Sequence, residues 1–120
     1  MPYEFDAARP IYLQLAEVLA RKIVSGEKQP GERLPGVREL AAEYGVNPNT
    51  AQRTMAELER LGLVRAERTT GRFVTDDCER IAAARRGIAG EEIAGFLKRM
   101  HLMGIGKAEL LELLTQFPVE

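Results

Sequence analysis

The sequence predicts a mainly α-helical fold with one small β-hairpin, organised as a domain over residues 1–75 and a two-helix element over residues 76–120. Apolar residues recur every three or four positions through several segments, which is the period of a helix that buries one face. Two short extended runs, LVRAE and RFVTD, enclose a turn and are typical of a hairpin. Acidic Asp76-Asp77 then marks a change in composition and the expected boundary.

The composition is that of a globular protein of one ordinary domain or a small domain with an accessory element. The 120 residues are 45% hydrophobic and 29% charged, without an apolar run long enough to cross a bilayer. The N-terminus, MPYEFDAARP, carries acids and lacks the apolar core of a secretory signal. Cys78 is the only cysteine, so an intramolecular disulfide is impossible. These features predict a cytoplasmic location.

The first helix is expected to begin at Pro10, where a missing N–H costs nothing, and to stop at Ser25-Gly26. Pro30-Gly31 then predicts a loop, with Arg33-Leu34 as a very short strand. The apolar face of the first helix contains Ile11, Leu15, Val18, Leu19 and Ile23.

Two further helices are separated by Gly45. The first spans about residues 37–44 behind an N-cap at Gly36, and the second starts at Asn47 with Pro48 in its first turn. The expected buried stripe of the second of these helices is Ala51, Met55, Leu58 and Leu61. Its opposite side carries Asn49, Gln52, Arg53, Ala56 and Arg60.

This order of two short helices around a glycine turn, followed by a hairpin, predicts a winged helix-turn-helix. In that fold the second helix enters the DNA major groove and contacts bases with its N-terminal residues. Asn-Pro at a helix start is explained by capping alone, but Asn49, Gln52 and Arg53 have no capping role and share an exposed face. A winged helix can also serve as a protein-interaction or architectural module without sequence-specific DNA readout.

Charge is distributed in a way that permits a DNA partner despite the overall net charge of −1. Residues 1–75 hold 11 basic and 10 acidic residues, and residues 76–120 hold 6 and 8. Local clustering of basic groups matters more for phosphate binding than the whole-chain charge does. Every basic residue in the segment from 53 to 72 is an arginine, namely Arg53, Arg60, Arg65, Arg68 and Arg72.

The run from Pro10 to Val74 resembles the N-terminal domain of GntR-type bacterial transcriptional regulators. The motifs PIYLQL, SGEKQPGERLP, VRELAAEYGV, NPNT, MAELERLGLV and GRFV agree with that family in order and spacing. The NPNT form is similar to the YtrA branch, and the tail LKRMHLMGIGKAELLELL is similar to the two-helix dimerisation element of that branch. The resemblance implies a homodimeric repressor that binds a palindromic double-stranded DNA operator.

The resemblance also implies roles for individual residues. Arg38 matches a DNA contact on the second helix, and Gly71 matches a wing-tip glycine. Gln52 stands where many relatives have an arginine, so a base contact is expected on Gln52 or Arg53. Gly36, Pro48, Thr69 and Gly106 depart from the family pattern. The expected DNA-binding residues are Arg38, Asn47, Asn49, Thr50, Gln52, Arg53, Arg68, Gly71 and Arg72.

The C-terminal 45 residues predict a long helix to about Met103 and a last helix over residues 107–117. Gly87, Gly90 and Gly95 weaken the long helix by about 1 kcal/mol each relative to alanine, which makes a kink or a close helix approach an open question. Two helices cannot enclose a pocket for a drug-sized ligand, so their apolar faces predict a twofold interface. The expected interface residues are Ile88, Ile93, Phe96, Leu97, Met100, Met103, Leu110, Leu111 and Leu114.

The sequence gives no indication of an enzyme or a metalloprotein. It has one histidine and lacks paired carboxylates or a Ser-His-Asp order, so we expect no catalytic residues, no metal and no cofactor. His101, Met100, Met103 and Cys78 are residue types that could suggest a soft-metal sensor, but both methionines are better explained by packing. Whether a small-molecule effector binds is left open.

Overall fold

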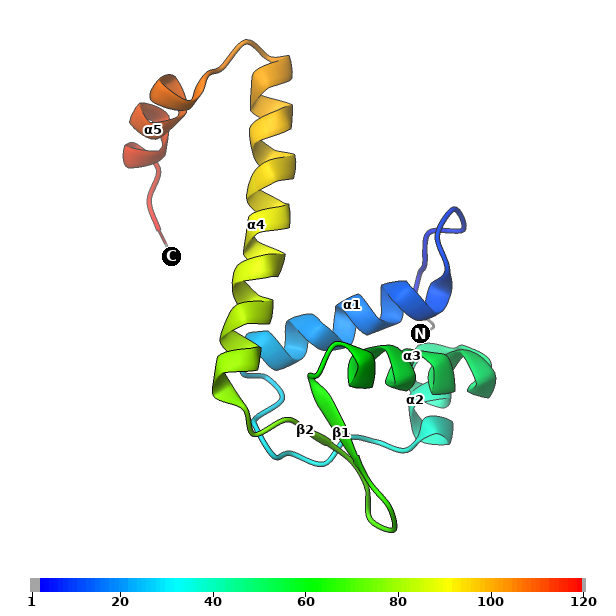
Figure 1. The fold of residues 1–120 in the computed structure, drawn as a ribbon. Coiled ribbons are helices and arrows are strands. Elements are labelled where there is room, and N and C mark those ends of the chain that lie inside the picture. Colours follow the sequence, from blue (N-terminus) through cyan, green and yellow to red (C-terminus); the bar gives the residue numbers. More distant parts are fainter. Residues whose placement is uncertain (1–2, 120) are drawn as a thin grey trace. The chain divides into compact units, whose positions relative to one another are not determined.

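The computed structural model describes residues 3–119, and the chain forms two compact units (Figure 1). The first extends to Arg85 and the second begins at Arg86. The expected boundary was at residue 76, but the first turns of the following helix belong with the N-terminal unit. Each unit is described by itself below.

Helix α1 spans Ile11–Val24. Pro10 is its N-cap rather than its first residue, with extended backbone angles of φ −56° and ψ 131°. Ile11 was expected on the buried face but is 42% exposed, since it is the first residue of α1 and lies at the end of the helix. Gln14 is buried instead, and its carboxamide accepts from the Asp6 N–H at 2.8 Å and donates to the carbonyls of Asp6 and Arg9.

Helix α2 (Val37–Tyr44) has the predicted limits, and helix α3 (Pro48–Arg60) begins after the predicted N-cap, Asn47. Gly45 joins them in the left-handed conformation, at φ 67°, which glycine adopts without the steric cost that a Cβ would add. Helix α3 packs against both α1 and α2, as Figure 1 shows. The glycine turn and these contacts make the helix-turn-helix arrangement.

The core of the first unit lies where α1, α2 and α3 meet the start of the hairpin. Leu61 was expected to complete the buried stripe of α3 but is 47% exposed, because the helix has ended by that residue and the chain is turning. Thr54 is fully buried and was missed, since a threonine gives no apolar signal. The most deeply buried large side chains are Leu15, Ile23, Leu40, Met55, Leu58, Leu63 and Val74.

Strands β1 (Val64–Glu67) and β2 (Gly71–Val74) pair antiparallel to form the predicted hairpin. Their register runs from Val64 opposite Val74 to Glu67 opposite Gly71. The expected strand at Arg33-Leu34 is reduced to an isolated bridge between Arg33 and Phe73, reinforced by the Leu34 N–H, which donates to the Arg72 carbonyl at 2.9 Å.

Helix α4 spans Cys78–Leu102 without interruption, so its three glycines do not end it. Its start is capped by Asp77, whose carboxylate accepts from the N–H groups of Glu79 and Arg80 at 3.1 and 3.2 Å. Ile81 is buried in the first unit. Met103, expected to extend the helical face, lies in the turn that follows.

Helix α5 spans Lys107–Thr115, and Gly106 precedes it as the N-cap. It ends before the expected limit at Phe117, because Pro118 disfavours helical angles in the residue that precedes it. Among the described residues, no helix is both long and apolar enough to cross a membrane.

Candidate nucleic-acid interface

The solvent-facing side of α3 carries the predicted readout residues. Asn49, Gln52 and Arg53 are exposed, whereas Ala51 and Met55 on the other side are buried. The helical periodicity therefore separated the packing face from the polar face correctly. What the polar side chains do on that face differs from residue to residue.

Asn47 and Asn49 have different roles at the start of α3. The side-chain oxygen of Asn47 accepts a hydrogen bond from the Asn49 N–H at 2.7 Å, which is an N-cap interaction. The Asn49 side chain makes no hydrogen bond with another described residue and remains exposed. Thr50 is half-buried, and its carbonyl accepts from the Thr54 hydroxyl at 2.9 Å. The Asn47 side chain therefore caps the helix, whereas the Asn49 side chain has no hydrogen-bond partner among the described residues.

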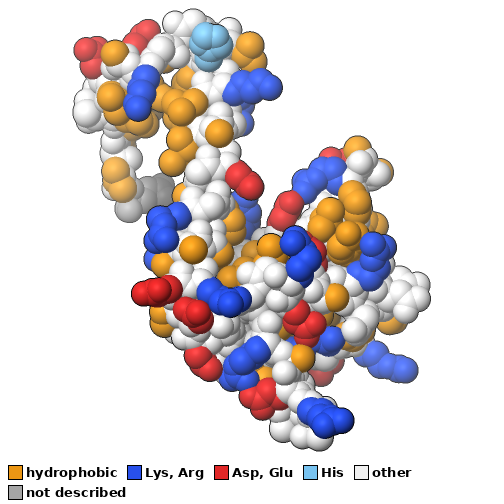
Figure 2. Space-filling view, in the orientation of Figure 1, with side chains coloured by type: hydrophobic (Ala, Val, Ile, Leu, Met, Phe, Trp, Pro, Cys, Tyr) orange, Lys and Arg blue, Asp and Glu red, His pale blue; other side chains and the backbone are white. Residues whose placement is uncertain are grey.

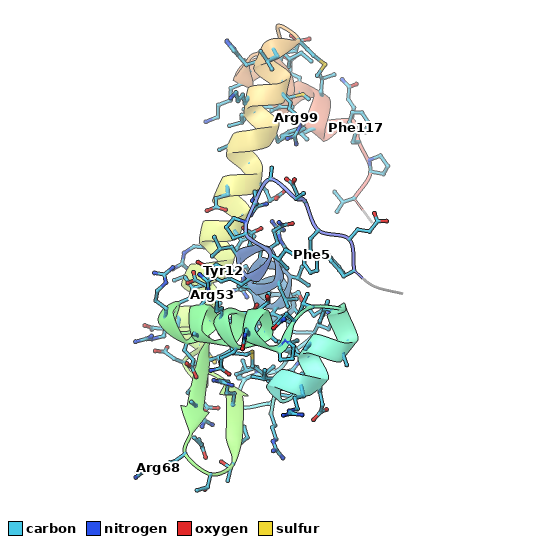
Figure 3. All side chains as sticks on the ribbon, turned by 90° about the vertical axis from the view of Figure 1, so that its right-hand side faces the viewer. Phe5, Tyr12, Arg53, Arg68, Arg99 and Phe117 are labelled. Atoms are coloured by element: carbon cyan, nitrogen blue, oxygen red, sulfur yellow. The ribbon has the colours of Figure 1, made fainter. Side chains whose placement is uncertain are left out.

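Gln52 and Arg53 point to different flanks of α3. Successive helical residues are about 100° apart around the axis. The Arg53 guanidinium stacks on the ring of Tyr12 in α1, with 4.0 Å between Cζ and the ring centroid (Figure 3). Gln52 makes no hydrogen bond with any described residue. Sequence reasoning missed Tyr12, because a contact between two helices leaves no local pattern.

Arg60, also on the exposed side of α3, forms an ion pair within that helix. Its guanidinium donates two hydrogen bonds to the Glu57 carboxylate, at 2.9 and 2.6 Å. Those hydrogen bonds lower the pKa of the Glu57 carboxyl below its ordinary value. The pair is largely exposed on the arginine side, so it contributes little to stability.

The hairpin forms the wing, and its arginines are not equivalent. Arg68 lies at the exposed tip (Figure 3) and makes no ion pair among the described residues. Arg72, which is also expected to bind DNA, donates to the Glu59 carboxylate of α3 at 3.0 Å, and its side chain is 22% exposed. This ion pair joins the wing to α3. Arg68 is therefore the better placed of the two to bind a partner.

The turn of the wing is joined to strand β1 by polar side-chain contacts. The Thr70 hydroxyl donates to the Glu67 carboxylate at 2.9 Å, and Arg65 also binds that carboxylate. Together, with the threonine bond as the larger cause, they lower the pKa of the Glu67 carboxyl. These contacts order the loop that carries Arg68.

Gly71 opens strand β2 at φ 113°, a conformation that other residues rarely adopt. A Cβ at this position would lie 3.4 Å from Nε of Arg33. Arg33, which sequence reasoning treated only as part of a short strand, thus places a guanidinium beside the wing. Arg33 is placed there by its isolated β-bridge to Phe73, and a pairing between residues so far apart in the chain leaves no local sequence pattern.

Arg38 lies on the exposed side of α2, opposite the buried Leu40 and Tyr44. The helix is short, and Gly36 precedes it as an N-cap with no side-chain cap bond. Arg38 therefore lies on the solvent-facing side of α2.

The second unit exposes a run of large apolar side chains (Figure 2). Leu110 differs from the other predicted interface residues, because its side chain is buried in the single chain. Ile88, Phe96 and Met100 are half-buried. Those that stand exposed are Ile93, Leu97, Met103, Leu111 and Leu114, together with Leu102 and Phe117.

Comparison with known proteins identifies relatives over nearly the whole length. The chain is 40% identical over 117 residues to the uncharacterized HTH-type transcriptional regulator YhcF of Bacillus subtilis, covering 98% of this chain and 97% of the relative. It is 26% identical over 115 residues to the HTH-type transcriptional repressor YtrA of the same organism, covering 95% and 88%.

Solved structures agree with the sequence relatives. A GntR family transcriptional regulator from Listeria monocytogenes superposes with a TM-score of 0.85 at 35% identity, covering 95% of this chain and all of that one. The DNA-binding domain of AraR, solved in complex with operator ORX1, superposes with a TM-score of 0.56 at 26% identity, covering 62% and 99%. The sequence model for bacterial regulatory proteins of the gntR family matches residues 11–74. The chain therefore belongs to the gntR family of bacterial regulatory proteins.

Proposed function

We propose that this regulator is a repressor that acts by occupying a palindromic DNA operator as a homodimer. The observation that carries the proposal is the solvent-facing side of α3, where Asn49 and Gln52 have no partner among the described residues of the protein. Polar side chains at the start of such a helix are what base readout in a major groove requires. The AraR domain, solved with its operator, supports DNA as the ligand of this fold.

Within this proposal the residues divide by the part of DNA that they contact. Asn49 and Gln52 hydrogen-bond base edges, with Asn47 and Thr50 supporting the helix start. Arg38 and Arg68 bind phosphates, Arg72 holds the wing against α3 through Glu59, and Gly71 allows the backbone of the wing to approach DNA. The sequence predicts a base contact for Arg53, but its stacking on Tyr12 favours a different role, which is argued below.

The homodimer is proposed from the apolar surface of the second unit. Exposed side chains such as Ile93, Leu111 and Leu114 are about half accessible to solvent. Contiguous exposed apolar surface of this kind favours burial against a second copy. A dimer would place two recognition helices on half-sites about 34–36 Å apart, and this spacing is why a palindromic operator is expected.

Selection from a randomised DNA duplex library with the purified protein tests the proposal. We expect an inverted repeat to be enriched, and we expect binding to that duplex to exceed binding to random DNA by about 10³-fold or more at physiological salt. Binding that is equally strong to every duplex, with the same salt dependence, would overturn the proposal and favour an architectural role. Absence of DNA binding would favour a protein-interaction module.

A further inference from the structure

We propose that Tyr12 is a positioning residue that holds the Arg53 guanidinium for contact with a DNA phosphate on the α1 side of α3. The inference rests on the proposed function, because it assigns a role to side chains at the same interface. It differs from base readout in its consequence: a phosphate contact strengthens binding to every sequence alike.

The contact that carries this inference is the stack between a cation and an aromatic face. Cζ of Arg53 lies 4.0 Å from the Tyr12 ring centroid, well within the range over which a ring attracts a guanidinium. Figure 3 shows the two side chains together beside α3, while Arg68 lies away from them at the tip of the wing. Tyr12 is half-buried and Arg53 is exposed, so the ring covers one face of a guanidinium that still reaches solvent.

Tyr12 is itself fixed to α3 by a second contact. The hydroxyl of Thr54, the residue after Arg53, lies 3.3 Å from the Tyr12 carbonyl and 2.9 Å from the Thr50 carbonyl. Thr54 is fully buried. The backbone of Tyr12 is therefore hydrogen-bonded to α3 next to Arg53, and this contact places the Tyr12 ring beside the recognition helix.

The charge of Arg53 remains uncompensated, unlike the charges of the arginines near it. Arg60 is paired with Glu57, and Arg72 is paired with Glu59. No carboxylate among the described residues forms a salt bridge with Arg53. A ring attracts a cation without neutralising it, so stacking leaves the full positive charge available to an anion.

The geometry favours a phosphate over a base as that anion. Arg53 lies on the flank of α3 that faces α1, whereas Gln52 lies about 100° further around the helix and is exposed. Phosphates line the rim of the groove into which such a helix is inserted, and base edges lie at its floor. With one face on the ring, the in-plane N–H groups of the guanidinium remain free to form the paired hydrogen bonds that phosphate accepts.

The test compares variants on two DNA duplexes, the one that the wild-type protein selects and a scrambled duplex of equal length. Tyr12→Phe keeps the ring, and Tyr12→Leu removes it while keeping apolar bulk. Arg53→Lys keeps the charge but lacks a planar group to stack, and its exposed position makes misfolding no concern. Thermal melting of each variant accompanies the binding measurement.

We expect Tyr12→Leu and Arg53→Lys each to weaken binding to both duplexes by about 2- to 5-fold, the size of an exposed cation–π contact. Arg53→Ala should lower the salt slope by about 1 and leave the selected sequence unchanged. In the Arg53→Ala background, Tyr12→Leu should have no further effect. Tyr12→Phe should bind like the wild type.

Three results would overturn the inference. They are additive losses from Tyr12→Leu and Arg53→Ala, wild-type binding by Arg53→Lys, and a changed sequence preference in any Tyr12 or Arg53 variant. Failure of the proposed function is recognised separately, because it appears in the wild-type protein as an inability to select any duplex.

Discussion

Of the two asparagines at the start of α3, we expect Asn47 to contribute to stability and Asn49 to DNA recognition. Asn47→Ala removes the acceptor for the Asn49 N–H, so we expect the free energy of unfolding to fall by about 1 kcal/mol in a urea titration. Asn49→Ala is the matched control, because its side chain caps nothing. It should leave the unfolding free energy within about 0.5 kcal/mol of the wild type and alter the selected DNA sequence instead. Equal destabilisation by both changes would contradict this division.

Gln52 is the side chain that we expect to discriminate most strongly among bases. Gln52→Ala should weaken binding to the selected duplex by about 1–3 kcal/mol and leave binding to random DNA nearly unchanged. Competition binding on the two duplexes measures the difference directly. An equal loss on every sequence would instead assign Gln52 to the phosphate backbone.

Gly71 holds a backbone conformation that its replacements cannot adopt without strain. Gly71→Ala places a Cβ at φ 113° and 3.4 Å from Arg33, so we expect a loss of about 1–3 kcal/mol in unfolding free energy. Gly87→Ala makes the same change inside α4, where no described atom beyond the neighbouring helix backbone lies within 4 Å of the added Cβ. It should stabilise the protein by about 0.5–1 kcal/mol. The opposite signs distinguish local strain from a general effect of alanine.

At the scale of elements, we expect the wing to contact the DNA backbone rather than the bases. Arg68 extends from the tip of the hairpin and makes no ion pair with another described residue. Arg68→Ala should therefore weaken binding to selected and random duplexes alike and reduce the salt slope by about 1. Fluorescence anisotropy over a salt series provides the slope. A loss confined to the selected duplex would indicate that the wing reads bases.

Elements that depend on local signals were predictable from the sequence, and contacts between elements were not. Gly45, Asn47 and Pro48 determine the limits of α2 and α3, because turn and cap residues act within a few positions of themselves. The ion pair of Arg72 with Glu59 and the stack of Arg53 on Tyr12 join residues from different elements. Side chains with the same local pattern could face solvent or a neighbouring helix, so the sequence identified the polar face of α3 but not the partners on it.

The apolar patterns of α4 and α5 raise the same difficulty at a larger scale. An apolar helical face predicts that its side chains are buried, but it does not identify the element or the partner that covers them. Leu110 is buried in the single chain, whereas Leu111 and Leu114 remain exposed. The homodimer is proposed from the apolar residues of this face that stay exposed in the single chain, such as Leu111 and Leu114.

For the whole molecule, that inference makes DNA affinity depend on α5, which carries none of the proposed DNA contacts. Leu114→Glu places a charge on the exposed apolar surface, so we expect sedimentation to show a monomer at micromolar concentration. Because linking two half-site contacts raises affinity by about 10²–10⁴-fold, the variant should lose a factor of that order on the selected inverted repeat. Its affinity for a single half-site should be unchanged, since the proposed reading residues lie in the first unit. Glu112→Gln, an exposed change on the same helix, is the control and should remain dimeric. A Leu114→Glu protein that stays dimeric would locate the interface elsewhere, and a wild-type protein that sediments as a monomer would contradict the homodimer itself.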